Sequence, residues 1–288
     1  MKIALLDDYQ GVALNCADWS SLQAKAEITV FRDTIAHGDA LVDRLQDFDI
    51  IGIMRERTPF PRSLLERLPN LKLLVTTGHR NASVDVAAAR ELGITVCGTP
   101  SSAHAAAELT WALIMAAARR LDLENRSFHG GGWQVGLGRD IKGTTLGVIG
   151  LGRLGSLVAG YGRAFGMRVI AWSQNLTPER AAECGAEAVD KNTLFRESDF
   201  VTLHLRLSDR SRGLVNAAML GLMKPDAWIV NTARGPIVDS GALLEALKAR
   251  RIGGAALDVF DVEPLPTDDE LRHLDNVEET PQNRYTTQ

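Results

Sequence analysis

The sequence predicts an α/β protein built from two doubly wound parallel-sheet domains. Short apolar runs alternate with helix-compatible segments along most of its 288 residues, which is typical of parallel sheets covered by helices. The alternation is broken once, by Gly-Thr-Pro-Ser-Ser at residues 98–102. Since a domain usually takes roughly 100–200 residues, we expect a first domain at 1–99, a second at 100–282, and a short, truncated C-terminal tail at 283–288.

The first domain is expected to have five strands, in a flavodoxin-like arrangement. The strands are short apolar runs at residues 3–6, 28–31, 50–54, 71–76 and 94–97. Helix-compatible segments separate them at 19–26, at 41–48, after a Ser63 cap, and at 84–92. Arg55-Glu56-Arg57 follows the third strand, and Gly78-His79-Arg80-Asn81 follows the fourth.

The second domain begins with a long apolar helix, expected at 103–119 with Ser101 or Ser102 as its cap. This helix, with Trp111, is a candidate homodimer surface, although burial inside the protein explains its composition equally well. A glycine-rich loop at 130–138 comes before the βα alternation resumes. Strands are expected at 146–149, 168–172, 200–205, 228–231 and 255–259, with helices after residue 154 and at 217–222 and 241–249.

A Gly-x-Gly-x-x-Gly turn lies between the strand at 146–149 and the helix that follows it. This strand–turn–helix context is what the dinucleotide fingerprint requires. Gly150 allows the tight turn, Gly152 lets the backbone approach a diphosphate, and Gly155 lets the helix lie near the strand. The first helical residues, Arg153 and Leu154, add free N–H groups to the same site. The second domain is therefore predicted to be a Rossmann domain; the alternative is a packing turn.

Composition excludes several other classes of protein. The net charge of −4 and the absence of a dense Lys/Arg run argue against a nucleic-acid partner. No apolar run approaches the ~18 residues of a membrane span. The three cysteines, Cys16, Cys97 and Cys184, fit neither a disulfide framework nor a zinc site. We therefore expect a cytoplasmic protein without a structural metal.

Several motifs occur in a fixed order along the chain, and together they resemble the D-isomer-specific 2-hydroxyacid dehydrogenase family, which includes phosphoglycerate dehydrogenase-like proteins. After the glycine turn come Asn-Thr-Ala-Arg-Gly at 231–235, Ala-Leu-Asp-Val-Phe at 256–260, and Glu-Pro at 263–264. The resemblance implies a substrate domain, a nucleotide-binding domain, and the reduction of small 2-keto acids by hydride from a nicotinamide.

The resemblance also implies roles for individual residues. Arg234 would bind the keto acid, because a planar guanidinium can bond to both the carbonyl and the carboxylate. Glu263 matches the acid that orients the family's catalytic histidine, and Asp258 matches a residue on the nicotinamide side. Backbone N–H groups of Gly78 and His79, with Arg55, would hold the substrate carboxylate. Further coenzyme contacts are expected from Leu205, Arg206, Ser211, Thr232 and Ala233.

The coenzyme is expected to be NAD or NADP. A carboxylate about 20 residues beyond the glycines would bind the ribose 2′-hydroxyl of NAD, but Ser173, Gln174 and Asn175 occupy that place. A 2′-phosphate would therefore meet no repulsion there. No arginine replaces the acid, although Arg153 is a candidate to reach a phosphate.

One departure from the family concerns the proton donor. The family has a histidine after Thr-Pro, whereas this chain reads Thr280-Pro281-Gln282. A glutamine amide donates a hydrogen bond but cannot deliver a proton at neutral pH. We therefore expect impaired activity, unless water or His79 substitutes; His204 is expected to be structural. The alternative is a catalytically inactive NAD(P)H-binding sensor or docking module.

Overall fold

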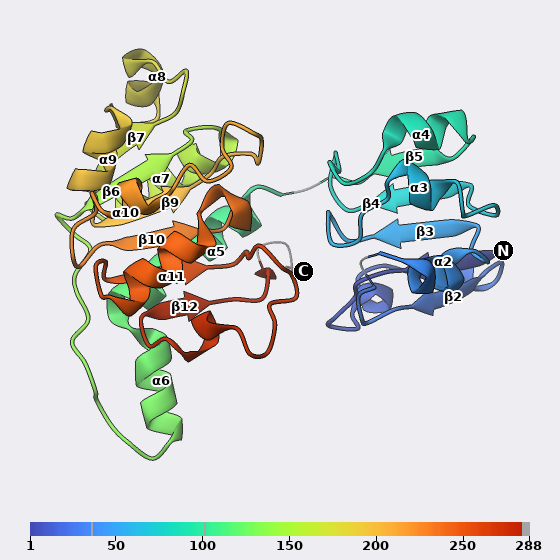
Figure 1. The fold of residues 1–288 in the computed structure, drawn as a ribbon, viewed down its shortest axis with the longest axis horizontal. Helices are drawn as coiled ribbons and strands as arrows, with labels where there is room; N and C mark the ends of the chain where they lie inside the picture. Colours follow the sequence, from blue (N-terminus) through green and yellow to red (C-terminus); the bar gives the residue numbers. More distant parts are fainter. Residues whose placement is uncertain (36, 101, 284–288) are drawn as a thin grey trace. The chain divides into compact units, whose positions relative to one another are not determined.

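The computed structural model describes residues 1–35, 37–100 and 102–283. The chain divides into two compact units, Met1–Ser101 and Ser102–Thr287. Each unit contains one all-parallel sheet covered by helices (Figure 1), which confirms the predicted fold class. Of the expected tail at 283–288, residues 284–288 lie outside the described part of the chain.

The first unit has a five-stranded sheet in the order β2-β1-β3-β4-β5. This is the 2-1-3-4-5 order of flavodoxin-like folds. The strands are β1 (Lys2–Leu5), β2 (Glu27–Val30), β3 (Ile50–Ile53), β4 (Leu73–Thr76) and β5 (Thr95–Gly98). The helices are α1 (Ser20–Gln23), α2 (Asp39–Leu45), α3 (Arg62–Leu65) and α4 (Val86–Glu91), with a 3-10 turn, η1 (Ala13–Asn15), before α1.

Two details of the first unit differ from the sequence prediction. Ser63 lies inside α3 and is not its cap, because Pro61, with a φ of −71°, is the residue at the N-cap. The helix expected at 19–26 is reduced to the four residues of α1, none of which is buried. An apolar face that packs on nothing gives a short helix little stability.

The second unit has a seven-stranded sheet in the order β12-β11-β10-β9-β6-β7-β8. Six of these strands follow the 3-2-1-4-5-6 order of the Rossmann fold, with β6 in the position of strand 1. The strands are β6 (Thr145–Ile149), β7 (Arg168–Trp172), β8 (Glu187–Ala188), β9 (Phe200–Leu203), β10 (Trp228–Asn231), β11 (Gly254–Leu257) and β12 (Val277–Glu279).

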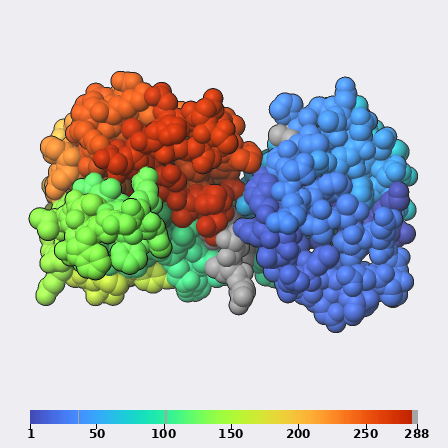
Figure 2. Space-filling model, turned by 90° about the horizontal axis from the view of Figure 1, so that it is seen from below, coloured from blue at the N-terminus to red at the C-terminus, as the bar shows by residue number. Residues whose placement is uncertain are grey.

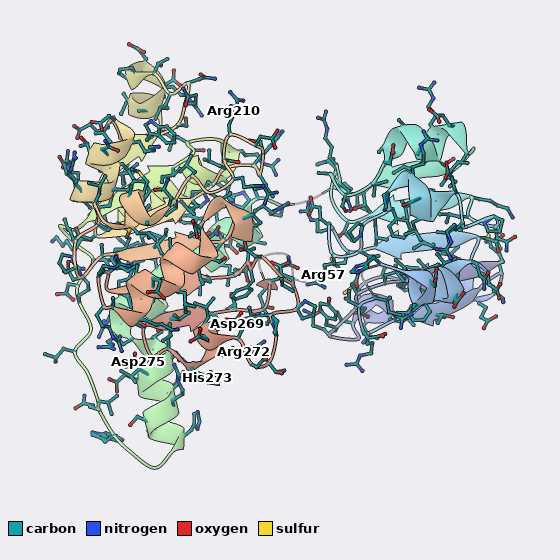
Figure 3. All side chains as sticks on the ribbon, in the orientation of Figure 1. Arg57, Arg210, Asp269, Arg272, His273 and Asp275 are labelled. Atoms are coloured by element: carbon teal, nitrogen blue, oxygen red, sulfur yellow. The ribbon has the colours of Figure 1, made fainter. Side chains whose placement is uncertain are left out.

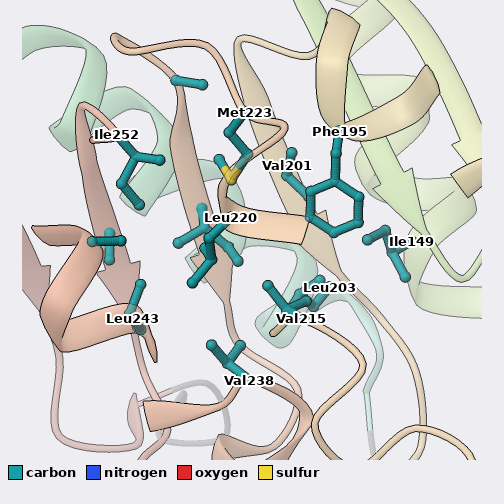
Figure 4. Close-up of a cluster of buried hydrophobic side chains, with 14 of the residues drawn as sticks. Ile149, Phe195, Val201, Leu203, Val215, Leu220, Met223, Val238, Leu243 and Ile252 are labelled. Atoms are coloured by element: carbon teal, nitrogen blue, oxygen red, sulfur yellow. The ribbon is translucent and has the colours of Figure 1, made fainter. Parts of the chain in front are cut away.

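Helices cover both faces of this sheet. On one face lie α5 (His104–Arg119), α7 (Arg153–Ala164) and α8 (Pro178–Glu183), and on the other lie α9 (Lys191–Glu197), α10 (Ala217–Leu220) and α11 (Ser240–Lys248). Figure 4 shows part of the second face, where Phe195 of α9, Leu220 of α10 and Leu243 of α11 pack together. The unit also contains two 3-10 turns, η2 (Gly235–Ile237) and η3 (Glu270–His273).

Helix α5 is built into the second unit. It packs against α7, β10 and β11, and its buried side chains include five alanines. This burial accounts for its apolar composition, so the alternative explanation given above holds and a dimer surface is not needed to explain it. Its N-cap is Ala103, although the Ser102 hydroxyl accepts a hydrogen bond from the His104 N–H (3.1 Å). Ser101 lies outside the described residues.

Sequence reasoning missed four helical or strand segments besides the two-residue β8: α6 (Leu121–His129), α8, α9 and β12. Helix α6 follows α5 directly, through Arg120 in the left-handed region (φ 54°), and none of its residues is buried. Without a buried face it lacks the periodic apolar pattern on which the prediction relied. Within the described part of the chain, no helix is both long enough and apolar enough to cross a bilayer.

Glu278 on β12 is a buried carboxyl group. Burial, followed by the nearby Asp122 carboxylate, raises its pKa to about 7. Since the protonated form is favoured in the native state, the stability from this group is complete below about pH 4.5 and is lost as pH rises through 7.

Replacing Glu278 with Gln is therefore expected to stabilise the protein at high pH. The amide keeps the shape and carries no charge, so we expect the free energy of unfolding to rise by about 2–3 kcal/mol at pH 8.5 and to be unchanged at pH 4. Urea unfolding at both pH values measures this. Glu245→Gln, on the exposed side of α11, is the control and should change stability by less than ~0.5 kcal/mol. A gain that is equal at both pH values would contradict the explanation.

Candidate active site

The carboxyl ends of four neighbouring strands, β6, β9, β10 and β11, lie at one edge of the second sheet. From β6 the chain winds to β7 and β8 on one side, and from β9 it winds to β10, β11 and β12 on the other. The point of reversal therefore lies between β6 and β9. In open α/β sheets, ligands bind outside the carboxyl ends of the strands at such a point.

The glycine turn after β6 has the geometry that a diphosphate requires. Gly150 has a φ of +96°, and a Cβ on Gly155 would lie 2.1 Å from the Gly150 carbonyl oxygen. These two glycines therefore allow the turn and the close approach of α7. A Cβ on Gly152 would meet nothing within 4 Å, so the space beside this residue is open. Arg153 and Leu154 begin α7, where N–H groups favour an anion.

The end of β7 lies beside this turn. The Gly150 N–H donates to the Trp172 carbonyl oxygen (2.9 Å), so Ser173 is the first residue past the strand at the predicted ribose position. Gln174 and Asn175 follow and are exposed. The three predicted ribose-binding residues therefore lie next to the glycine turn.

The loop after β9 lies on the other side of Gly150. A Cβ on Gly150 would lie 2.8 Å from Leu205 Cδ2. The buried Ser211 hydroxyl donates to the Arg206 carbonyl oxygen (2.7 Å) and accepts from the Ser208 N–H (2.8 Å). Ser211 thus fixes the shape of this loop, whose exposed Arg210 is labelled in Figure 3.

His204 begins the same loop. Its Nε2 is 3.0 Å from the Thr202 hydroxyl, and burial lowers the pKa of His204 to about 3. The imidazole is therefore neutral at physiological pH and cannot serve as a proton donor there. This agrees with a structural role.

The segment after β10 is fixed by buried polar side chains. The Asn231 side chain accepts from the Ala233 N–H (3.0 Å) and donates to the Arg234 carbonyl oxygen (2.9 Å). The Thr232 hydroxyl is 2.7 Å from that of Thr110 on α5. Arg234 is partly buried, and its Nη1 donates to the Ala233 carbonyl oxygen (2.8 Å). These hydrogen bonds fix the backbone from which the Arg234 side chain extends.

Asp258 connects the end of β11 to the segment after β12. It is fully buried, and its Oδ1 accepts from the Thr280 hydroxyl (2.8 Å) and from the Asn283 N–H (2.6 Å). Gln282 lies between these two anchored residues. The carboxylate therefore holds the position of the glutamine that replaces the expected histidine.

Glu263 and Gln282 are in contact, as the motif predicts. Glu263 Oε1 accepts from the Phe260 N–H (2.9 Å), and its Oε2 accepts from Gln282 Nε2. Glu263 therefore orients the side chain at position 282, and a neutral amide occupies the place expected for an imidazole.

The predicted substrate-binding residues of the first unit lie after β3 and β4. A Cβ on Gly78 (φ +99°) would lie 2.2 Å from Arg55 Nη1, so the guanidinium lies against Gly78. The Gly78 N–H donates to the Thr99 hydroxyl (2.9 Å), which means that binding a carboxylate here would require this donor to change partner. His79 is exposed.

Sequence reasoning missed several polar side chains that shape these regions. Thr110 and Asn231 support the β10 end, and the only sequence signal for Thr110 is a hydroxyl within an alanine-rich helix. In the first unit, buried Asp7 at the end of β1 accepts from the Thr34 (2.6 Å) and Thr58 (2.8 Å) hydroxyls, and burial raises its pKa. No group of three or more His, Cys, Asp or Glu side chains among the described residues could hold a metal ion.

Comparison with known proteins identifies the class of this fold and site. Residues 111–282 match the family described as D-isomer specific 2-hydroxyacid dehydrogenase, NAD binding domain. The second unit is therefore a nicotinamide-dinucleotide-binding domain. The chain belongs to the D-isomer specific 2-hydroxyacid dehydrogenase family.

Individual relatives cover most of the chain. It is 43% identical to a glyoxylate reductase of Aeropyrum pernix, over 74% of this chain and 67% of the relative. It is 40% identical to a D-3-phosphoglycerate dehydrogenase of Methanocaldococcus jannaschii, over 87% of this chain but only 48% of that protein. The chain thus spans about half the length of that dehydrogenase. A crystal structure of a Ralstonia solanacearum oxidoreductase, described as a putative D-3-phosphoglycerate dehydrogenase, superposes with a TM-score of 0.93 at 40% identity, over 99% of this chain and 88% of that one.

The open space at Gly152 leads to a prediction about dinucleotide binding. Gly152→Ala introduces a methyl group that meets no protein atom within 4 Å but fills space expected for the diphosphate. We expect the affinities for NADH and NADPH to fall at least about tenfold, measured by quenching of protein fluorescence, with the unfolding midpoint unchanged.

Gly160→Ala is the matched control. Gly160 lies within α7, whose N-cap is Gly152, and a Cβ added there would also meet no atom within 4 Å, so its replacement should leave the affinity unchanged and add about 0.5–1 kcal/mol of stability. Unchanged affinity in Gly152→Ala would show that the turn does not face the diphosphate.

Proposed function

We propose that this chain reduces a small 2-keto acid with NADH or NADPH. The main support is the arrangement at one sheet edge of the glycine turn, Arg234, Asp258 and the Glu263–Gln282 pair. The names of the relatives, a glyoxylate reductase and a phosphoglycerate dehydrogenase, support the same class of substrate.

The site residues would act on the substrate in complementary ways. A bound reduced nicotinamide supplies the hydride that reaches the keto carbon. The Arg234 guanidinium would bond to the carboxylate and to the carbonyl oxygen, where negative charge develops. Arg55, Gly78 and His79 are proposed to hold the substrate carboxylate, with residues 1–99 acting as the substrate domain.

Among the described residues, this site lacks an evident donor for the proton that completes the new hydroxyl group. Gln282 can donate a hydrogen bond to the carbonyl oxygen but retains its protons at neutral pH. General acid catalysis contributes about 10²–10⁴-fold, so the reaction is expected to be slower by that order. Water, or His79 in the first unit, would then supply the proton.

An inactive NAD(P)H-binding sensor is the alternative function. It predicts micromolar coenzyme affinity and no turnover of glyoxylate, pyruvate or hydroxypyruvate, even after a histidine is restored at position 282. The relatives named above are described as a reductase and dehydrogenases, so the comparisons do not favour this alternative. Following NADPH and NADH oxidation with a panel of small 2-keto acids tests the proposed function directly.

We also propose that the chain is a cytoplasmic homodimer. For the location, the support is that all three cysteines are free and that Cys16 and Cys97 are exposed, as expected in a reducing compartment. For the dimer, the support is a group of exposed apolar side chains on α6 and the loop at 130–138, which forms part of the surface in Figure 2 (green). Phe128, Trp133 and Leu137 are 59%, 72% and 94% exposed, and such a patch is typical of an interface.

Restoring the histidine should raise catalysis. We expect Gln282→His to increase kcat for keto-acid reduction at least about tenfold, because an imidazole beside Glu263 can carry and release a proton near neutral pH. Steady-state NADPH oxidation measures this, with circular dichroism to confirm the fold.

The double variant Gln282→His/Glu263→Gln is the control for that experiment. Glu263 should favour the protonated imidazole, so the double variant is expected to lose most of the gain and to shift the pH profile of kcat to lower pH. An unchanged rate in Gln282→His would show that position 282 does not limit the reaction.

The homodimer is tested by changing the exposed patch. Trp133→Ser with Leu137→Ser removes two large apolar side chains and should convert the dimer to a monomer, as measured by light scattering after size exclusion. Val262→Ser, at a site that is 62% exposed outside the patch, should leave the mass unchanged. A wild-type protein that is already monomeric would refute the dimer.

A further inference from the structure

The ribose end of the coenzyme site lies at the carboxyl end of β7. In the Rossmann fold, a carboxylate at this place accepts hydrogen bonds from the ribose hydroxyls of NAD. β7 pairs with β6 in parallel, with Trp172 opposite Ile149, and the Gly150 N–H is bonded to the Trp172 carbonyl oxygen. Ser173 and Gln174 therefore lie where that carboxylate would be.

The side chains at this place are neutral hydrogen-bonding groups. Ser173 has a hydroxyl, and Gln174 and Asn175 have amides that are exposed. All three can donate to phosphate oxygens, and none repels a phosphate dianion. A 2′-phosphate on the ribose would therefore meet donors without meeting a like charge from this segment.

A positive charge lies at the same strand end. Lys191 is the first residue of α9, and its Nζ is 5.8 Å from the centroid of the Trp172 ring, on the last residue of β7. The indole face attracts the ammonium group and keeps it near this end of the sheet. The contact comes from a segment about 19 residues further along the chain, so sequence spacing did not reveal it.

The acidic residue next to Lys191 in the sequence, Asp190, is already hydrogen-bonded to other groups. Asp190 accepts from the Thr193 N–H (3.0 Å) and from the Thr193 hydroxyl (2.5 Å), as the cap of α9. On α8, Arg180 is paired with Glu183 (2.8 Å). Lys191 is thus a basic side chain held at the end of β7 by its contact with the Trp172 ring.

We propose that this site prefers NADPH to NADH and that Lys191 determines the preference by binding the 2′-phosphate. The proposal rests on the proposed function, because it concerns the coenzyme of the same site. Arg153, at the start of α7, is assigned instead to the diphosphate, which both coenzymes share. The two basic residues therefore have different expected effects.

Equilibrium binding of NADPH and NADH to the whole chain, followed by quenching of protein fluorescence, tests this assignment without requiring turnover. We expect the wild type to bind NADPH at least about tenfold more tightly than NADH, since an ammonium–phosphate pair is a strong charge-assisted contact. Lys191→Met should weaken NADPH binding about tenfold and change NADH binding less than twofold. Arg153→Met should weaken both to a similar extent.

Two further variants complete the experiment. Gln174→Asp places a carboxylate at the ribose and should reverse the preference towards NADH. Lys142→Met is the matched control: Lys142 is exposed and precedes β6 at the opposite edge of the sheet, so its replacement should change neither affinity.

The possible outcomes separate this inference from the proposed function. Equal or tighter binding of NADH by the wild type overturns the preference but leaves the proposed function intact. An equal loss for both coenzymes in Lys191→Met overturns the role of Lys191. If neither reduced coenzyme binds, both the inference and the proposed function are refuted.

Discussion

Parallel strand pairing is the constraint on which the whole site depends. Because all strands of the second sheet run in the same direction, their carboxyl ends meet at one edge. The first and last of these sites, the glycine turn and Asp258, are more than 100 residues apart in the sequence, and Arg234 lies between them. Each nevertheless follows the end of a strand in the same sheet. No long-range side-chain contact has to bring them together, since the backbone hydrogen bonds of the sheet already do so.

The sequence was sufficient to predict the features that depend on local patterns, namely most strands and the motif residues at their ends. Apolar runs located ten of the twelve strands to within a few residues, and the motif residues at 150–155, 234, 258 and 263 lie at one sheet edge. The missed elements lack such a pattern: α6 has no buried residue, β8 has only two residues, and β12 carries two glutamates in three positions. Contacts that depend on tertiary packing, such as Thr110–Thr232 and Lys191–Trp172, have no signal in sequence spacing.

The Glu263–Gln282 contact places a neutral amide where the family resemblance implies a histidine. Glutamine has a donor at about the reach of an imidazole, so Glu263 keeps a hydrogen-bonding partner and the segment after β12 stays anchored to Asp258. The electrostatic relationship differs, because a neutral amide cannot place beside the carboxylate the positive charge that a protonated imidazole would carry. Position 282 therefore keeps a hydrogen bond to Glu263 with a side chain that cannot deliver a proton at neutral pH.

The hydrogen bond from the Gly150 N–H to the Trp172 carbonyl oxygen has a thermodynamic consequence for ligand capture. It ties the turn to the neighbouring strand, so the loop is already ordered before a ligand arrives and little backbone entropy remains to be lost on association. We therefore expect the ligand to bind a preformed site, without ordering of the loop on binding. The association rate should then be set by diffusion and charge more than by loop rearrangement.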